Sequence, residues 1–228
     1  TKTFSGTTPE MLTAEGKLDE TAPVGRYVPE LEASGFADAT VRQVMDMTAG
    51  IDFSEDYTDP NSGIGAFSNA LGLTPRAPGY AGPTSLYSYL PALKAKGAHG
   101  EAFTYRTVNT EVLGWIIQRI EGKRSADVLS ERLWGPLGME SEAELLADSA
   151  GTAFAGGGLN ACLHDLARFG EAMRLGGRFN GRQIIPVAAV ASIRRGGRLL
   201  GEDRSGNCQK FGNSELAQHN NPLSIGIE

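Results

Sequence analysis

The segment from Asn109 to Gly122 constrains the fold most strongly, because its apolar residues repeat with the period of a helix. Five of them fall on one helical face: Val112, Leu113, Ile116, Ile117 and Ile120. Gly122 follows two positions later, and glycine is the residue that most often stands just past a helix end. The pattern therefore predicts a helix over 109–122 whose apolar face lies against a core.

Other parts of the chain predict shorter elements. Amphipathic patterns predict helices at 40–47, 126–133 and 163–175. Thr8-Pro9 resembles the cap and first turn of a further helix near the N-terminus. Residues 51–101 contain Gly, Pro, Asn or Ser in every short window, which predicts a long irregular segment of the kind that forms the walls of binding sites. The whole pattern favours an α+β or α/β class with prominent helices.

Composition excludes several classes of function. The net charge is −6 and no basic stripe is present, so we expect no nucleic-acid partner. No apolar run approaches the roughly 18 residues of a membrane span, so we expect no membrane partner. Cys162 and Cys208 are too few for a disulfide framework or a zinc cage, and the three histidines lack metal-ligand spacing. We therefore expect no metal or other cofactor, and a small molecule as the partner.

Three features could carry chemistry on the residues alone. Tyr105 stands between a short strand pattern and the predicted helix at 109–122, where a half-buried core tyrosine is the common case. The glycines at 156–158 lack the Lys and Ser/Thr of a phosphate-binding loop, so a tight turn is favoured. A helix start explains Asp165 beside His164 without catalysis, although sequence spacing leaves a Ser-His-Asp triad open.

Five segments, taken in order, resemble the serine β-lactamase and penicillin-recognising hydrolase family, especially its branch related to class C β-lactamases and esterases. Each segment is a weak match alone, but their order and spacing together are specific. The matching segments are 18–31, 39–50, 105–122, 133–139 and 155–169. The resemblance covers residues 1–196 and leaves 197–228 unmatched.

The resemblance implies a mechanism that uses a Ser-x-x-Lys motif, a tyrosine base and an oxyanion hole. Lys2 matches the lysine of that motif and Tyr105 matches the tyrosine. The nucleophilic serine is then expected two residues before Thr1, because no serine in the chain is followed three positions later by lysine. We therefore expect a chain truncated at both ends, and inactive as written.

Within the family, the chain is most similar to hydrolases of linear amides. That similarity implies contacts with the substrate from Tyr57, Thr107 and Gly156, where Gly156 replaces an asparagine that tunes substrate preference. The expected function is hydrolysis of a linear amide through an acyl-enzyme when the protein is intact. Esters, D-alanyl-D-alanine peptides and β-lactams are the alternative substrates, and a non-catalytic binding module on the same scaffold is the alternative function.

The resemblance also implies the architecture, an α+β fold with a helical domain and an antiparallel sheet flanked by helices. Residues 5–101 are expected to be mainly helices and binding loops, and 102–196 to return toward the α/β part. The sheet is expected to be incomplete in this chain, with 197–228 a poorly specified tail. The low cysteine count and the similarity to linear-amide hydrolases favour a cytoplasmic location. The sequence leaves the oligomeric state open.

Overall fold

The computed structural model of the chain describes residues 1–196 and 224–227. The helices in these residues are α1 (Lys2–Ala14), α2 (Val41–Met45), α3 (Gly63–Leu71), α4 (Leu86–Tyr89), α5 (Thr107–Glu121), α6 (Ser125–Leu129), α7 (Leu163–Arg174) and α8 (Val187–Arg195). The strands are β1 (Ala143–Leu146), β2 (Leu159–Asn160), β3 (Arg178–Phe179), β4 (Arg182–Gln183) and β5 (Ser224–Ile227). Single 3₁₀ turns lie at Val24–Arg26, Pro29–Leu31 and Leu90–Ala92, and a π-helical turn lies at Ser130–Trp134.

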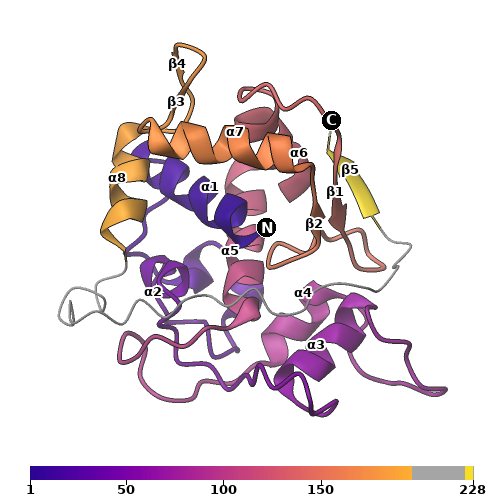
Figure 1. The fold of residues 1–228 in the computed structure, drawn as a ribbon. Coiled ribbons are helices and arrows are strands. Elements are labelled where there is room, and N and C mark those ends of the chain that lie inside the picture. The colour runs from indigo at the N-terminus through magenta and orange to yellow at the C-terminus, as the bar shows by residue number, and fades with distance from the viewer. Residues whose placement is uncertain (197–223, 228) are drawn as a thin grey trace.

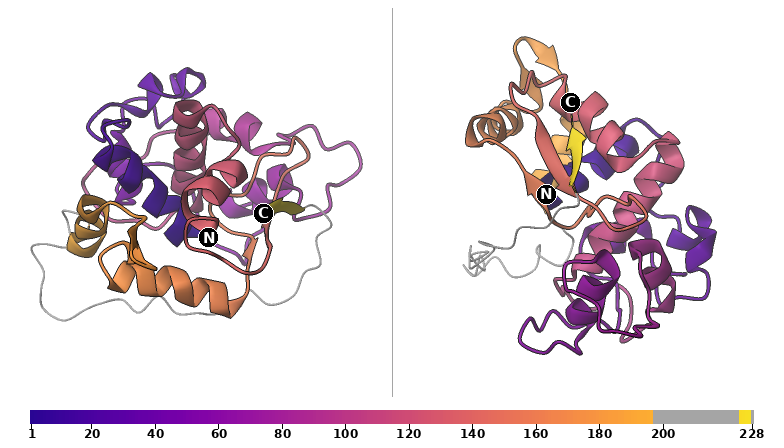
Figure 2. Two further views of the ribbon diagram at one scale, coloured as in Figure 1. Left: turned by 90° about the horizontal axis from the view of Figure 1, so that it is seen from above. Right: turned by 90° about the vertical axis from the view of Figure 1, so that its right-hand side faces the viewer.

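Helix α5 runs through the middle of the molecule (Figures 1 and 2), and its buried apolar residues belong to one of two apolar cores. Every residue from Thr107 to Ile117 is buried, and Gly122 ends the helix in the left-handed conformation at φ 66°. The helix predicted over 109–122 is therefore confirmed, with a start two residues earlier. One core packs α5 against the segments between Leu12 and Leu93, and the other gathers residues of α1, α6, α7, α8 and β1.

Helix α1 begins at Lys2, so the helix start predicted at Thr8-Pro9 is wrong, and Pro9 lies inside the helix. Tertiary packing overrides the local rule, because Phe4 in the first turn is buried in the second core. Its ring lies 4.4 Å from the ring of Phe169 and 5.9 Å from that of Trp134, between centroids. Burial of such an aromatic side chain offsets the backbone hydrogen bond that Pro9 cannot make.

The other predicted helices are present with shifted ends. Helix α2 covers part of 40–47, and Thr40 caps it reciprocally with Gln43. The helix predicted at 126–133 is α6 followed by the π-helical turn, and α7 matches 163–175 closely. Residues 51–101 are irregular except for α3, α4 and a single 3₁₀ turn, so the expectation of an entirely irregular segment is corrected there.

Short antiparallel ladders complete the α+β fold. Strand β1 pairs with β2 on one side and with β5 on the other, and Glu144 faces Asn160 and Gly226 across the two ladders. Strands β3 and β4 form a hairpin through Asn180 and Gly181, both at positive φ, which the mirror-image hairpin turns require. Of the segment 197–228 that the sequence leaves unassigned, only β5 lies within the described residues.

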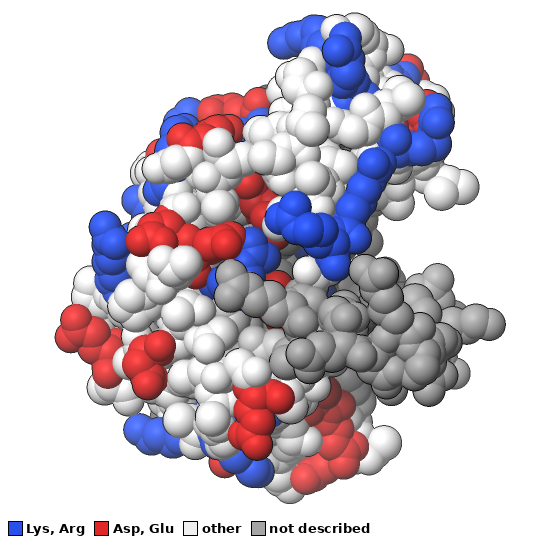
Figure 3. All heavy atoms as spheres, turned by 90° about the vertical axis from the view of Figure 1, so that its left-hand side faces the viewer, with Lys and Arg blue, Asp and Glu red and all other residues white. Residues whose placement is uncertain are grey.

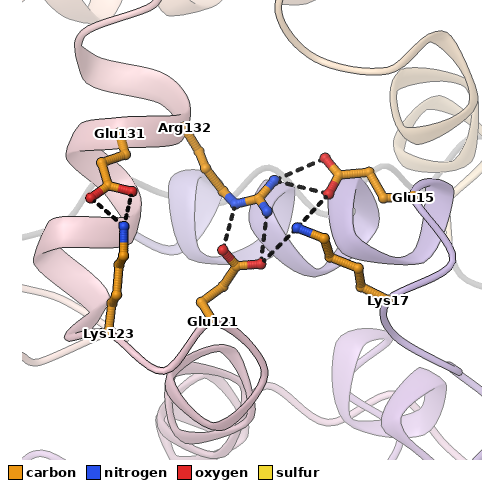
Figure 4. A network of polar contacts seen from close by, with 6 residues as sticks. All are labelled: Glu15, Lys17, Glu121, Lys123, Glu131 and Arg132. Atoms are coloured by element: carbon orange, nitrogen blue, oxygen red, sulfur yellow. Dashed lines mark hydrogen bonds and ion pairs between the residues drawn. The ribbon is translucent and has the colours of Figure 1, made fainter.

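Both ends of α1 are fastened to α5. At the C-terminal end, Arg132 bridges Glu15 and Glu121 at nitrogen–oxygen distances of 2.8 and 2.7 Å, and Lys17 adds a contact to Glu121 at 3.3 Å (Figure 4). The N-terminal end is held through a turn described below. The two helices therefore hold the first turn of α1 beside the first turns of α5.

Surface charge is divided on the face that α1, α2 and α8 share. Basic side chains gather toward the β3–β4 hairpin and α8, and carboxylates are prominent elsewhere (Figure 3). None of the helices described is long and apolar enough to cross a membrane.

Candidate active site

Lys2 and Tyr105, which are far apart in sequence, lie together in the structure. The Nζ atom of Lys2 lies 5.0 Å from the centroid of the Tyr105 ring, within cation–π range. The same Nζ atom donates a short hydrogen bond to the carbonyl oxygen of Gly156. Lys2 occupies the first turn of α1, and Tyr105 precedes the first turn of α5, so the two helix starts bring the pair together.

The turn that receives Lys2 is fixed to α1 by further hydrogen bonds. The hydroxyl of Ser5 donates to the carbonyl oxygen of Ala155 at 2.7 Å, and the amide of Leu159 donates to Oγ1 of Thr1 at 2.8 Å. Each joins residues about 150 positions apart in sequence. The glycine turn therefore forms a wall beside the first turn of α1.

Glu111 holds the same turn from the side of α5. Its Oε1 atom accepts from the Gly156 amide at 2.6 Å, and its Oε2 atom accepts from the Ala155 amide at 3.1 Å. Burial raises the pKa of Glu111 to about 8, although the two amides and the charge of Lys2 act in the opposite direction. This residue was not predicted from the sequence, although a glutamate within the apolar run of the helix was a visible signal.

Close packing explains the glycine at position 156. A Cβ atom placed there would lie 2.7 Å from Oε1 of Glu111 and 2.8 Å from Cγ2 of Thr107. Gly158 is also crowded, since its Cβ would meet the side chain of Leu146 at 2.7 Å, and its φ is +73°. The interpretation of 156–158 as a tight turn is confirmed. Gly156 offers Lys2 a backbone carbonyl and has no room for a side chain.

The loop that carries Tyr57 meets the N-terminus of α5 through Glu55. One oxygen of Glu55 accepts a short hydrogen bond from the Thr107 amide, and the other accepts from the Tyr57 hydroxyl at 2.8 Å. A carboxylate at the start of a helix is favoured by the helix dipole. Burial of the phenol oxygen and the neighbouring Glu55 raise the pKa of Tyr57, although 69% of the residue is exposed. Glu55 is the second residue that the sequence analysis missed.

The structure thus brings all five predicted site residues to one place. Thr107 adjoins Gly156 and is linked to Tyr57 through Glu55, while Lys2 joins Gly156 to Tyr105. Lys2 also borders a cavity of about 300 Å³, lined by α1, by residues 45–48, by Phe103 and by the end of α8. Among the described residues, no group of three or more His, Cys, Asp or Glu is placed to hold a metal ion.

The His164–Asp165 pair lies outside this arrangement. His164 is largely exposed and contacts Glu140 at 3.5 Å. Asp165 is fully buried and accepts from the amides of Glu140 and Ser141 at 2.8 and 3.1 Å. Asp165 therefore has a structural role, as the sequence suggested, but it fixes the preceding loop rather than capping its own helix.

A fold of helices around small antiparallel sheets, with a lysine and a tyrosine placed together at two helix starts, is typical of the β-lactamase family. The family model described as "Beta-lactamase" matches residues 1–209, and the chain belongs to this family.

Two proteins described as 6-aminohexanoate-dimer hydrolases are similar to the chain. The chain is 38% identical over 196 residues to the 6-aminohexanoate-dimer hydrolase of Paenarthrobacter ureafaciens, and the match covers 86% of this chain and 49% of that protein. A solved structure of a candidate 6-aminohexanoate-dimer hydrolase from Bacillus anthracis is 34% identical with a TM-score of 0.78, covering 85% of this chain and 50% of that one.

A more distant structure shares the fold. The D-stereospecific amidohydrolase of a Streptomyces species is 21% identical with a TM-score of 0.60, covering 83% of this chain and 62% of that one. The chain thus spans about half the length of the 6-aminohexanoate-dimer hydrolases that it matches.

Proposed function

We propose that these residues belong to a hydrolase of linear amides that works through an acyl-enzyme, with a substrate of the 6-aminohexanoate-oligomer type found in nylon by-products. The observation that carries the proposal is the placement of Lys2 Nζ at 5.0 Å from the Tyr105 ring, beside the turn at 156. The 38% identity to a 6-aminohexanoate-dimer hydrolase supports the substrate class.

In this mechanism Lys2 and Tyr105 share the work of proton transfer at a serine three residues before Lys2. Tyr105 takes the proton of the attacking serine and returns it to the leaving amine. In this proposal Tyr57, Thr107 and Gly156 contact the substrate. The sequence contains no Ser-x-x-Lys, so we expect no acyl-enzyme from the 228 residues alone.

The test is acylation by a chromophoric activated ester, followed by intact mass spectrometry. The 228-residue chain should keep its mass and release no burst of chromophore. The same residues, extended so that a serine stands three positions before Lys2, should gain one acyl group on that serine. A burst of one equivalent from the 228-residue chain would overturn the proposal.

Variants of the extended protein test the roles of the residues. Tyr105→Phe keeps the ring over which Lys2 lies and removes only the hydroxyl, and it should slow acylation by roughly 10²–10⁴-fold. Tyr27→Phe is the matched control, because the Tyr27 hydroxyl accepts a backbone hydrogen bond from Asp19 at 2.9 Å, away from the site.

Competition between a linear amide, an ester, a D-alanyl-D-alanine peptide and a β-lactam ranks the alternative substrates. We infer a cytoplasmic location from the low cysteine count and from the similarity to linear-amide hydrolases.

A further inference from the structure

Glu111 is a buried carboxyl beside the candidate site that the proposed chemistry does not use. It lies in the second turn of α5 with 1% of its surface exposed. The charged or titratable groups that act on it are Lys2 from α1, Asp148 from the loop after β1, and Tyr87 from α4. Both of its oxygens accept from consecutive backbone amides, those of Ala155 and Gly156. Hydrogen bonds compensate the desolvation of a buried carboxyl, and here both backbone hydrogen bonds come from one turn.

The polar groups of that turn are divided between two helices. Its amides at 155 and 156 point to Glu111 on α5, at 3.1 and 2.6 Å. Its carbonyls at the same residues accept from α1, where Ser5 donates to Ala155 and Lys2 donates to Gly156. The residue on which the Lys2 ammonium rests is therefore held from the opposite side by Glu111. Gly156 and the Glu111 carboxyl are in close contact, because a Cβ atom at position 156 would lie 2.7 Å from Oε1 of Glu111.

We propose that Glu111 is a positioning residue, which fixes the Ala155–Gly156 turn so that the Gly156 carbonyl holds the Lys2 ammonium beside Tyr105. Its catalytic consequence rests on the proposed function, since that function gives Lys2 its role. The placement of Lys2 does not depend on turnover and can be measured without it.

The experiment is competitive labelling of amines with trace acetic anhydride at pH 9, where Glu111 is ionised. Peptide mass spectrometry with fragmentation separates Lys2 from the α-amine of Thr1. The labelling rate of Lys2 is expressed relative to that of the exposed Lys94 in the same molecule. Glu111→Gln keeps the shape but turns an amide NH₂ toward one backbone N–H, and it should raise the relative rate of Lys2 by about threefold or more. Glu111→Asp keeps the charge but is one methylene shorter, and it should give a smaller rise.

Asp148→Asn is the matched control. Asp148 is also a buried carboxyl that accepts backbone amides, those of Leu86, Ala150 and Thr152 at 2.7–2.9 Å, but these amides lie outside the 155–156 turn. This variant should leave the relative rate of Lys2 unchanged. An unchanged rate in both Glu111 variants, or an equal rise in Asp148→Asn, would overturn the proposal.

A second readout separates this proposal from the proposed function. In the serine-containing protein, Glu111→Gln should lower kcat by about tenfold or more with little change in KM, because it displaces a group that acts on the reacting atoms. If Glu111→Gln raises the relative labelling rate of Lys2 but the serine-containing protein without this substitution is not acylated, the proposed function is refuted and the positioning role stands. If the serine-containing protein is acylated at the same rate with and without Glu111→Gln, and the labelling rate of Lys2 is unchanged, the positioning role is refuted and the proposed function stands.

Discussion

Adding a single methyl group at position 156 tests how tightly the candidate site is built. In Gly156→Ala the new Cβ atom would lie 2.7 Å from Oε1 of Glu111, 2.8 Å from Cγ2 of Thr107 and 3.1 Å from the ring of Phe154. The Glu111 oxygen is not free to move away, because it accepts from the amide of the substituted residue. The structure therefore predicts a loss of stability, although alanine is the smallest possible addition.

The magnitude follows from two contributions. Overpacking a filled interior costs about 1–3 kcal/mol. Loss of the hydrogen bond from the amide at 156 to the buried carboxyl adds about 1.5–3 kcal/mol. We therefore expect the free energy of unfolding to fall by roughly 2.5–6 kcal/mol, which lowers the urea midpoint by about 1 M or more at an ordinary dependence of stability on urea.

Gly170→Ala is the matched control for this substitution. Gly170 lies inside α7, and a Cβ atom there would meet nothing within 4 Å. Alanine is the better helix former, so this variant should gain about 0.5–1 kcal/mol. Urea unfolding of the two variants and the unmodified chain gives both values. A Gly156→Ala protein that unfolds within 0.5 kcal/mol of the unmodified chain would show that the turn has room, and the reasoning would fail.

Three more predictions concern stability and are measured by urea unfolding. The pKa of Glu111 is raised from 4.5 to about 8, so the folded state binds that proton more tightly and the free energy of unfolding should fall between about pH 4.5 and pH 8. The total fall should be on the order of a few kcal/mol. Glu111→Gln should make it smaller, and an unchanged fall would argue against this role of Glu111. Arg42→Ala should cost about 3–5 kcal/mol, because Glu10, Glu20 and Asp46 would lose their shared partner, and a loss below 1 kcal/mol would contradict that role. Phe4→Ala should cost about 3–5 kcal/mol, and a loss no larger than that of an exposed residue would show that the first turn of α1 is not packed.

The elements that the sequence predicted well are those whose signal is local. The helix at α5 follows from the spacing of its own apolar residues, and α2 follows from the amphipathic pattern at 40–47. The start of α1 was missed because its decisive contact is distant: Phe4 packs on Phe169. A rule about proline in a helix contains no information on such a contact.

The candidate site shows the same division. Lys2 and Tyr105 could be paired only through the resemblance to a family, since the two residues are 103 positions apart in the sequence. Glu55 and Glu111 were missed because their partners lie 52 and 44–45 residues away, at Thr107 and in the 155–156 turn. Spacing along one helix could have indicated that Thr107 and Glu111 share a face, but not what that face contacts.

The contact between positions 111 and 156 has a consequence for how the sequence can change over time. The carboxyl of Glu111 and the missing side chain of Gly156 fill one space, and a Cβ atom at 156 would reach within 2.7 Å of that carboxyl. A relative that carries a side chain at 156 therefore needs a smaller or differently placed residue at 111. We expect the two positions to covary among relatives, so that a graft of either residue alone into this chain fails where the exchange of both succeeds.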